Sequence, residues 1–174
     1  MGDQDATFPG GLLSQGWGCP YTFHPLGWST PNALVSSNDG MWYRIYGSGP
    51  ISKIGLYLGA SSGNICVGVY RGTQGDAAPT ARLATSGSVA SPGTGYREIS
   101  LGGTVVVNEN TDWFAFSADN TTVTVADGMP AVTGVENAIG AGFAYRALTS
   151  FPLPSTATGL VATIRCAFIL VGRP

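Results

Sequence analysis

The residue types that could carry out catalysis are few in this sequence and far apart. The single histidine, His24, lies between Phe23 and Pro25. A catalytic serine that depends on a histidine base would have to use it. Nothing close to His24 in the sequence suggests a catalytic partner for it. The histidine therefore does not indicate a hydrolase.

The cysteines do not form a metal-binding or disulfide pattern. Cys19, Cys66 and Cys166 are odd in number and lack Cys-x-x-Cys spacing. With one histidine in the chain, a zinc site that needs three protein ligands is not indicated either. We expect small buried thiols, no metal and no cofactor.

A glycosidase requires a pair of carboxylates about 5 Å or about 6.5–9.5 Å apart. Glu98 lies in a predicted strand, whereas Asp112, Asp119 and Asp127 lie at strand ends or in turns. Residues in such positions usually accept hydrogen bonds from the backbone of the turn, and this interpretation is favoured. A loop calcium site built from Asp76, Asp119 or Asp127 stays open, although no EF-hand-like spacing supports it. We therefore predict that the chain is not an enzyme.

Aromatic residues on predicted strands are the remaining candidates for ligand binding. An exposed Trp or Tyr ring can stack against the apolar face of a sugar, whereas a buried one belongs to the core. Tyr57 is predicted to share a strand face with Lys53, and Tyr70 to share one with Cys66. The predicted ligand-binding residues are Trp42, Tyr57, Tyr70, Tyr96 and Trp113.

Composition excludes several classes of partner. Charged residues make up 10 % of the chain and the net charge is −2, against about 25 % charged residues in an average soluble protein. One lysine, Lys53, and scattered arginines provide no basic run for nucleic acid. No segment approaches the roughly 18 apolar residues of a membrane helix. The start, MGDQDATFPGG, lacks a basic segment followed by an apolar run, so we expect synthesis in a cytoplasm without a cleaved signal peptide.

Alternating apolar residues separated by Gly- and Pro-rich turns predict an all-β protein. The stretch ISKIGLYLGASSGNICVGVYRG (51–72) predicts two strands of a hairpin, with Ile54, Leu56, Leu58, Ile65, Val67 and Val69 in the core. Two further strands are predicted on either side of Gly102-Gly103, and TDWFAFSAD (111–119) should direct Phe114 and Phe116 away from Trp113. About eight such strands indicate an antiparallel β-sandwich, most simply of the jelly-roll type.

The two ends of the chain carry the predicted assembly contacts. Residues 160–171 are predicted as one strand whose far end is apolar on both faces, at Ile169 and Val171. Residues 1–40 form an irregular arm preceding the sandwich domain of residues 41–174. The arm carries aromatic side chains that a solvated tail would not usually have, so we expect it to dock on the sandwich or on a neighbouring subunit. Its predicted contact residues are Trp17, Tyr21, Phe23 and Trp28.

The stretch from Pro50 to Asn120 resembles a jelly-roll module of bacteriophage minor tail and other virion-surface proteins, which is similar to carbohydrate-binding modules. The resemblance is carried by ISKIGLYLGASSGNICVGVY, by ARLATSGSV after Pro79, and by GYREISLGGTVVV and TDWFAFSADN. It implies a non-enzymatic virion structural protein, located at the tail tip or fibre or decorating the capsid. It also implies a homo-oligomer, with a trimer favoured, that contacts other virion proteins and can contribute to attachment to a host cell-surface glycan. The alternative is a free-standing carbohydrate-binding module.

Overall fold

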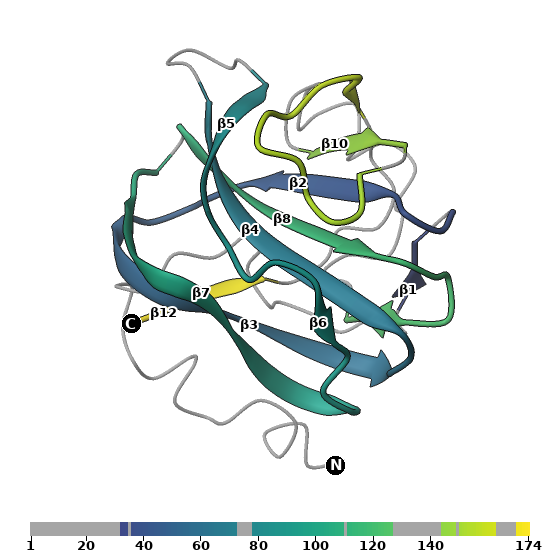
Figure 1. The fold of residues 1–174 in the computed structure, drawn as a ribbon. Coiled ribbons are helices and arrows are strands. Elements are labelled where there is room, and N and C mark those ends of the chain that lie inside the picture. The colour runs from purple at the N-terminus through teal and green to yellow at the C-terminus, as the bar shows by residue number, and fades with distance from the viewer. Residues whose placement is uncertain are drawn as a thin grey trace, which may run out of the picture.

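Two antiparallel β-sheets pack face to face around one apolar core (Figure 1). The computed structural model describes residues 32–34, 36–72, 78–109, 111–126, 144–148, 150–162 and 170–174. The antiparallel β-sandwich predicted from the sequence is confirmed. Within these ranges, no helix is long and apolar enough to cross a membrane.

The first sheet, sheet A, is organised around β3 (Gly49–Ala60). One edge of β3 pairs with β7 (Gly95–Val107). Its other edge pairs with β12 (Val171–Arg173) and, further along, with β9 (Thr124–Val125). The short strand β1 (Asn32–Ala33) pairs with β9, so part of the segment predicted as an irregular arm is a strand of the sandwich.

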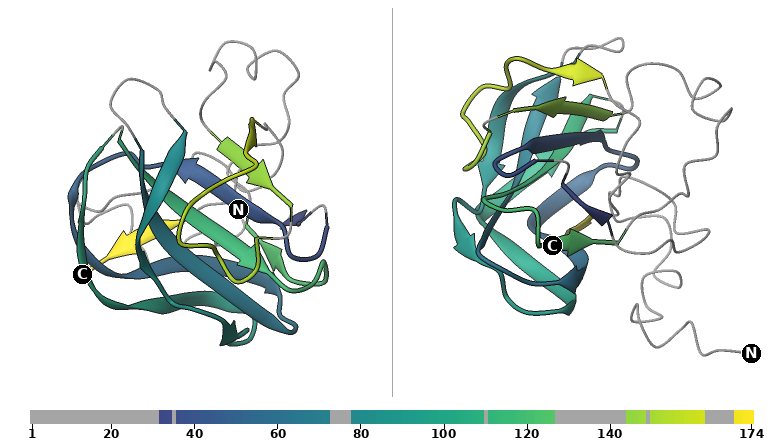
Figure 2. Two further views of the ribbon diagram at one scale, coloured as in Figure 1. Left: turned by 45° about the horizontal axis from the view of Figure 1, so that its top comes forward. Right: turned by 90° about the vertical axis from the view of Figure 1, so that its right-hand side faces the viewer.

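The second sheet, sheet B, has β8 (Asp112–Ala118) between β2 (Gly40–Arg44) and β4 (Asn64–Gly72). Beyond β2 lie β10 (Ala144–Ala147) and β11 (Val161–Ala162). On the other side β4 pairs with β5 (Pro79–Thr85) and with β6 (Val89–Ala90). The two further views in Figure 2 show the layers from other sides.

The core between the sheets follows the predicted alternation. All six core residues predicted on β3 and β4 are fully buried. Phe114 and Phe116 of β8 belong to the same core, whereas Trp113 and Ala115 face the outer side of sheet B. Because successive side chains of a strand point to opposite faces, each strand contributes every second residue to this core.

The hairpin predicted for residues 51–72 is wrong, because β3 lies in sheet A and β4 in sheet B. Residues 61–63 lead from one layer to the other. A hairpin within one sheet and an arch between two sheets bury the same alternate residues, so alternation alone does not distinguish them. As a consequence, Tyr57 and Tyr70 lie on opposite outer faces of the sandwich.

Two other strand predictions are also corrected. The two strands predicted around Gly102-Gly103 are one long strand, β7, in which Gly102 has a φ of 73°. The single strand predicted for residues 160–171 is wrong as well, since β11 belongs to sheet B and β12 to sheet A. Leu160 packs on the outer side of sheet B and Leu170 in the core between the sheets. The two ends of this stretch therefore bury their leucines in different places.

The outer face of sheet B is covered by residues 150–160, which we call the covering segment (Figure 2). Its backbone follows the edge of β5: the Arg82 N–H donates to the Ser155 carbonyl at 2.9 Å, and the Ala157 N–H to the Thr80 carbonyl at 2.7 Å. These bonds satisfy backbone groups of an edge strand that would otherwise be open to pairing with another chain. The covering segment thus encloses a second apolar layer.

Candidate functional site

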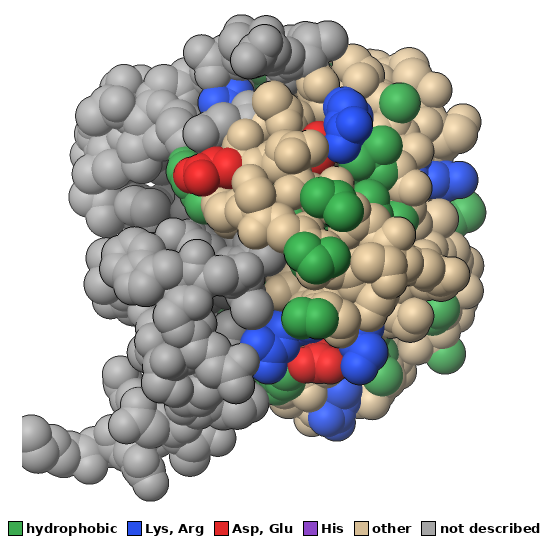
Figure 3. All heavy atoms as spheres, turned by 90° about the vertical axis from the view of Figure 1, so that its left-hand side faces the viewer, with side chains coloured by type: hydrophobic (Ala, Val, Ile, Leu, Met, Phe, Trp, Pro, Cys, Tyr) green, Lys and Arg blue, Asp and Glu red, His purple; other side chains and the backbone are tan. Residues whose placement is uncertain are grey.

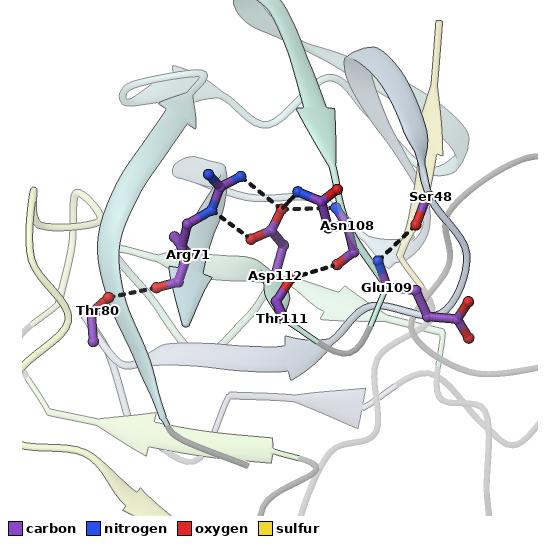
Figure 4. Close-up of polar contacts among 7 residues, drawn as sticks. All are labelled: Ser48, Arg71, Thr80, Asn108, Glu109, Thr111 and Asp112. Carbon is purple, nitrogen blue, oxygen red and sulfur yellow. Dashed lines mark hydrogen bonds and ion pairs between the residues drawn. The ribbon is translucent and has the colours of Figure 1, made fainter. Parts of the chain in front are cut away.

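Asp112, one of the predicted turn-capping carboxylates, is buried and fully engaged at the start of β8 (Figure 4). Its Oδ1 and Oδ2 accept hydrogen bonds from Nε and Nη2 of Arg71 at 3.0 and 3.2 Å. Oδ2 also accepts the backbone N–H of Asn108 at 2.8 Å. The prediction that this carboxylate caps a turn is confirmed.

Asp119 has the same kind of role at the other end of β8. It accepts the backbone N–H and the side-chain amide of Asn64 at 3.0 and 2.8 Å. Hydrogen bonds from the Asn120 side chain and then from Asn64 hold the pKa of Asp119 below its usual range. The Asn120 side chain in turn accepts the backbone N–H groups of Thr122 and Val123, so the Asn-Thr-Thr triplet forms a turn.

The remaining candidates for catalysis or metal binding form no site in the part of the chain that the structure describes. His24, Asp76, Asp127, Cys19 and Cys166 lie outside the described residues. Among the described residues, no group of three His, Cys, Asp or Glu side chains could hold a metal ion. Cys66 is a free, buried thiol, as predicted.

Three of the five predicted ligand-binding aromatics are buried under the covering segment. Trp42, Tyr70 and Trp113 have at most 1 % of their surface exposed. The rings of Trp42 and Tyr70 meet edge to face at 5.7 Å, and the Tyr70 hydroxyl donates to the Pro154 carbonyl. The prediction that these three contact a ligand is wrong for this structure, because the covering segment occupies the surface that they would present.

The other two, Tyr57 and Tyr96, lie on the outer face of sheet A and are directly paired across β3 and β7. The same register places Glu98 opposite Gly55, and β12 adds Arg173 beside Lys53. Ile54, Leu56 and Ile99 alternate with these residues and point into the core. We call this outer surface the tyrosine face; it consists of Lys53, Gly55, Tyr57, Tyr96, Glu98 and Arg173.

Glu98 connects the polar groups of the tyrosine face. Its Oε1 accepts hydrogen bonds from the Tyr96 hydroxyl and from Nε of Arg173, both at 3.3 Å. Its Oε2 accepts a hydrogen bond from Nζ of Lys53 at 3.4 Å. Desolvation is the largest single influence on the pKa of Glu98 and raises it, but the hydrogen bonds from Arg173 and Lys53 together lower the pKa below its usual range. Glu98 is therefore ionised at neutral pH.

Gly55 determines where the Tyr96 ring lies. A Cβ atom at position 55 would be 2.9 Å from Cζ and 3.1 Å from Cε2 of Tyr96, and closer still to the hydroxyl. The ring therefore rests across the backbone of β3, in space that a side chain would fill. A glycine inside a strand often marks such a close approach.

Charged residues make up only 10 % of the chain. Figure 3 shows one side of the molecule, on which basic and acidic side chains form small mixed clusters separated by uncharged surface. The tyrosine face also combines charges of both signs, because Lys53 and Arg173 both pair with Glu98.

The predicted assembly contacts are only partly described. Trp17, Tyr21, Phe23, Trp28 and Ile169 lie outside the described residues. Val171 pairs with Gly55 on the side opposite the core and is 4 % exposed. At this end of the chain Leu170 is buried in the core and Val171 on the opposite side of the strand. Because the burial of Val171 is complete within one chain, it does not require a second subunit, and Val171 offers little surface for one.

Sequence reasoning missed two members of the tyrosine face, Gly55 and Arg173. The signal for Gly55 was a glycine between Ile54 and Leu56 in an otherwise regular strand. Arg173 has no local signal, because it reaches the face through the pairing of β12 with β3.

No protein-family model matches the chain, and no curated protein or solved structure matches it.

Proposed function

We propose that the chain is a non-enzymatic structural protein of a bacteriophage virion, in which a jelly-roll-type sandwich carries a surface for attachment to the host. The resemblance of residues 50–120 to virion-surface modules supports this proposal. So does the use of Asp112 and Asp119, which bond to the backbone and neighbouring side chains of the fold and form no reactive pair.

The observation that carries the proposal is the tyrosine face. It combines two half-buried aromatic rings with a network of hydrogen-bonding groups on the outer face of sheet A. Such an arrangement offers hydrogen-bonding groups beside aromatic rings, which suits the binding of another molecule.

Immunogold electron microscopy tests the location. An antibody raised against the purified chain should label particles released from the cells that encode it, at one defined position on the tail or the capsid. Light scattering of the purified chain should also give the mass of a trimer. Unlabelled particles would contradict the proposal.

The alternative, a free-standing carbohydrate-binding module, is supported by the same tyrosine face. The two functions differ in where the protein is found. Antibody signal in particle-free supernatant, with none on particles, would favour the free-standing module.

A further inference from the structure

We infer that β12 is an exchangeable strand: its place in sheet A can be filled by β12 of a second copy of the chain, which links the two copies. The inference rests on the proposed structural role in a particle and names the contact between neighbouring copies. We call the place that β12 fills the β12 site; it consists of the edge of β3 at Lys53–Gly55 and the adjoining core space.

The β12 site holds four consecutive residues, each in a defined position. Leu170 is fully buried in the core between the sheets. The next three residues pair with β3 from Gly55 back to Lys53 (Figure 1). Arg173 also donates from its Nε to Oε1 of Glu98 at 3.3 Å. The site therefore fixes the register of a strand that enters it.

Gly172 makes the β12 site selective. A Cβ atom at this position would lie 2.7 Å from Cγ2 of Ile51 and 3.0 Å from Cζ of Phe114. Both of these side chains are fully buried, so neither can move aside without disturbing the core. The site thus takes glycine here, followed by an arginine that reaches Glu98, and Gly-Arg occurs once in the sequence. The strand that fits the site is therefore β12 itself, which a second copy also carries.

β12 can leave its site without changing the other strand pairs. It is short, Val171–Arg173, and among the described strands it pairs with β3 alone. The preceding strand, β11, belongs to sheet B, so β12 is not one arm of a hairpin. A strand that is held by few pairs opens at a lower free energy than the whole domain. Opening of β12 exposes the edge of β3, to which a strand of another chain can pair.

Exchange preserves the contacts of the β12 site. The same pairs and the same buried leucine form whether β12 comes from its own chain or from a neighbour, and strand exchange is for this reason a low-cost route to oligomers. Exchange also needs no exposed apolar surface, in agreement with the burial of Val171. A strand joined to its site by a short connection has an effective concentration in the mM range. Copies held side by side in a particle compete with it at such concentrations.

The arrangement of one strand and one site in each copy also determines the type of assembly. When each copy donates β12 to the next, the contacts are head to tail and close into a ring. A ring of three agrees with the trimer that light scattering should detect.

Thiol crosslinking between whole chains tests the inference. Lys53→Cys is introduced into one chain and Arg173→Cys into an isotope-labelled second chain, each with Cys19→Ser and Cys166→Ser. The two positions are directly opposite, so their Cβ atoms lie about 5 Å apart, within reach of a short bifunctional thiol reagent. The chains are unfolded, mixed at about 1 mM, refolded and crosslinked. Mass spectrometry should find this mixed pair at least about fivefold more often than a control pair of Lys53→Cys with Leu148→Cys, because position 148 is exposed but lies outside the β12 site.

A mixed pair at the control level would overturn the inference, because β12 would then stay within its own chain. The double variant Lys53→Cys/Arg173→Cys checks the reagent and should crosslink within one chain at low protein concentration. If it does not, β12 does not lie beside β3 and the inference is wrong as well. Antibody labelling tests the proposed location on a particle separately, so that proposal can stand when exchange fails.

A substitution in the donor strand tests the role of the glycine. Gly172→Val, added to the Arg173→Cys chain, should lower the yield of the mixed pair about tenfold, because the new side chain does not fit beside Ile51. Pro174→Val is the matched control at an exposed neighbouring position and should leave the yield unchanged. Circular dichroism verifies that the sandwich is retained, and Gly172→Ala replaces the valine variant if that one does not fold. A yield that is unaffected by the substitution of Gly172 would overturn the assignment of the β12 site.

Discussion

The outer faces of the two sheets have the same alternating sequence pattern but differ in how deeply their aromatic residues are buried. In each sheet, aromatic residues alternate with core residues and therefore point away from the core. On sheet B, the covering segment encloses Trp42 and Trp113. On sheet A, Tyr57 and Tyr96 stay half-buried beside Lys53 and Glu98. Whether an outward aromatic becomes core or contact surface is thus decided by what lies over it, and the strand pattern carries no information about that.

The largest expected difference between the faces concerns their aromatic residues. Trp113→Ala should lower the free energy of unfolding by about 3–5 kcal/mol, because it empties a buried site. Tyr96→Ala should lower it by less than about 1 kcal/mol, since substitutions at the surface have small effects. Urea unfolding followed by circular dichroism measures both. Similar losses for the two variants would show that the faces are not energetically distinct.

The covering segment itself can be tested through Leu153, which is buried against the outer layer of sheet B. Leu153→Ala should lower the free energy of unfolding by about 2 kcal/mol, at the low end for a buried leucine because a surface segment can partly relax. The control is Leu148→Ala, because Leu148 is 64 % exposed; its effect should stay within about 0.5 kcal/mol. If the two variants lose the same free energy of unfolding, the packing of the covering segment does not stabilise the fold.

Removing one tyrosine hydroxyl should also cost more stability under the covering segment than on the tyrosine face. Tyr70→Phe removes the bond to the Pro154 carbonyl and should cost about 1 kcal/mol, since a buried acceptor loses its donor. Tyr96→Phe removes an exposed bond to Glu98 and should cost no more than about 0.5 kcal/mol. Thermal unfolding resolves this difference, and a larger cost at Tyr96 would reverse the comparison.

The smallest effect is expected at Glu98, whose pKa is lowered in the folded protein. A carboxyl with a lowered folded pKa adds stability above its unfolded pKa of about 4.3, and that stability is lost as the pH falls through the folded value. Glu98→Gln should therefore destabilise slightly at pH 7 and not at pH 2. Unfolding midpoints across this range test it; a difference that grows toward acid would contradict the sign of the shift.

The sequence predicted the core well because alternation is a local property. Residues such as Leu56 and Val67 are apolar at every second position, and each strand buries that side wherever it is placed. The partner of a strand is not local. The same alternation fits a hairpin and an arch, so β3 and β4 were assigned to one sheet when they belong to two.

The candidate site was predicted in part for the same reason. Tyr57 was expected to share a face with Lys53, which is a matter of strand parity. Arg173 belongs to the tyrosine face only because β12 pairs with β3, which places it beside Lys53. These two residues are far apart in the sequence, so no local pattern predicts their pairing. The covering segment has no regular alternation of apolar residues. Its position over Trp42, Tyr70 and Trp113 therefore could not be predicted from the sequence pattern.

The division of the C-terminal stretch between the two sheets has a consequence for synthesis. Arg173 pairs with Lys53, and Leu170 fills a place in the core between the sheets. These residues leave the ribosome after every other described strand, so sheet A stays incomplete until they have emerged. Pairing of segments so distant in sequence is slow to form, because the chain must first lose the entropy of a long loop. Until then the edge of β3 at Lys53–Gly55 lacks its partner strand and is open to pairing with another chain.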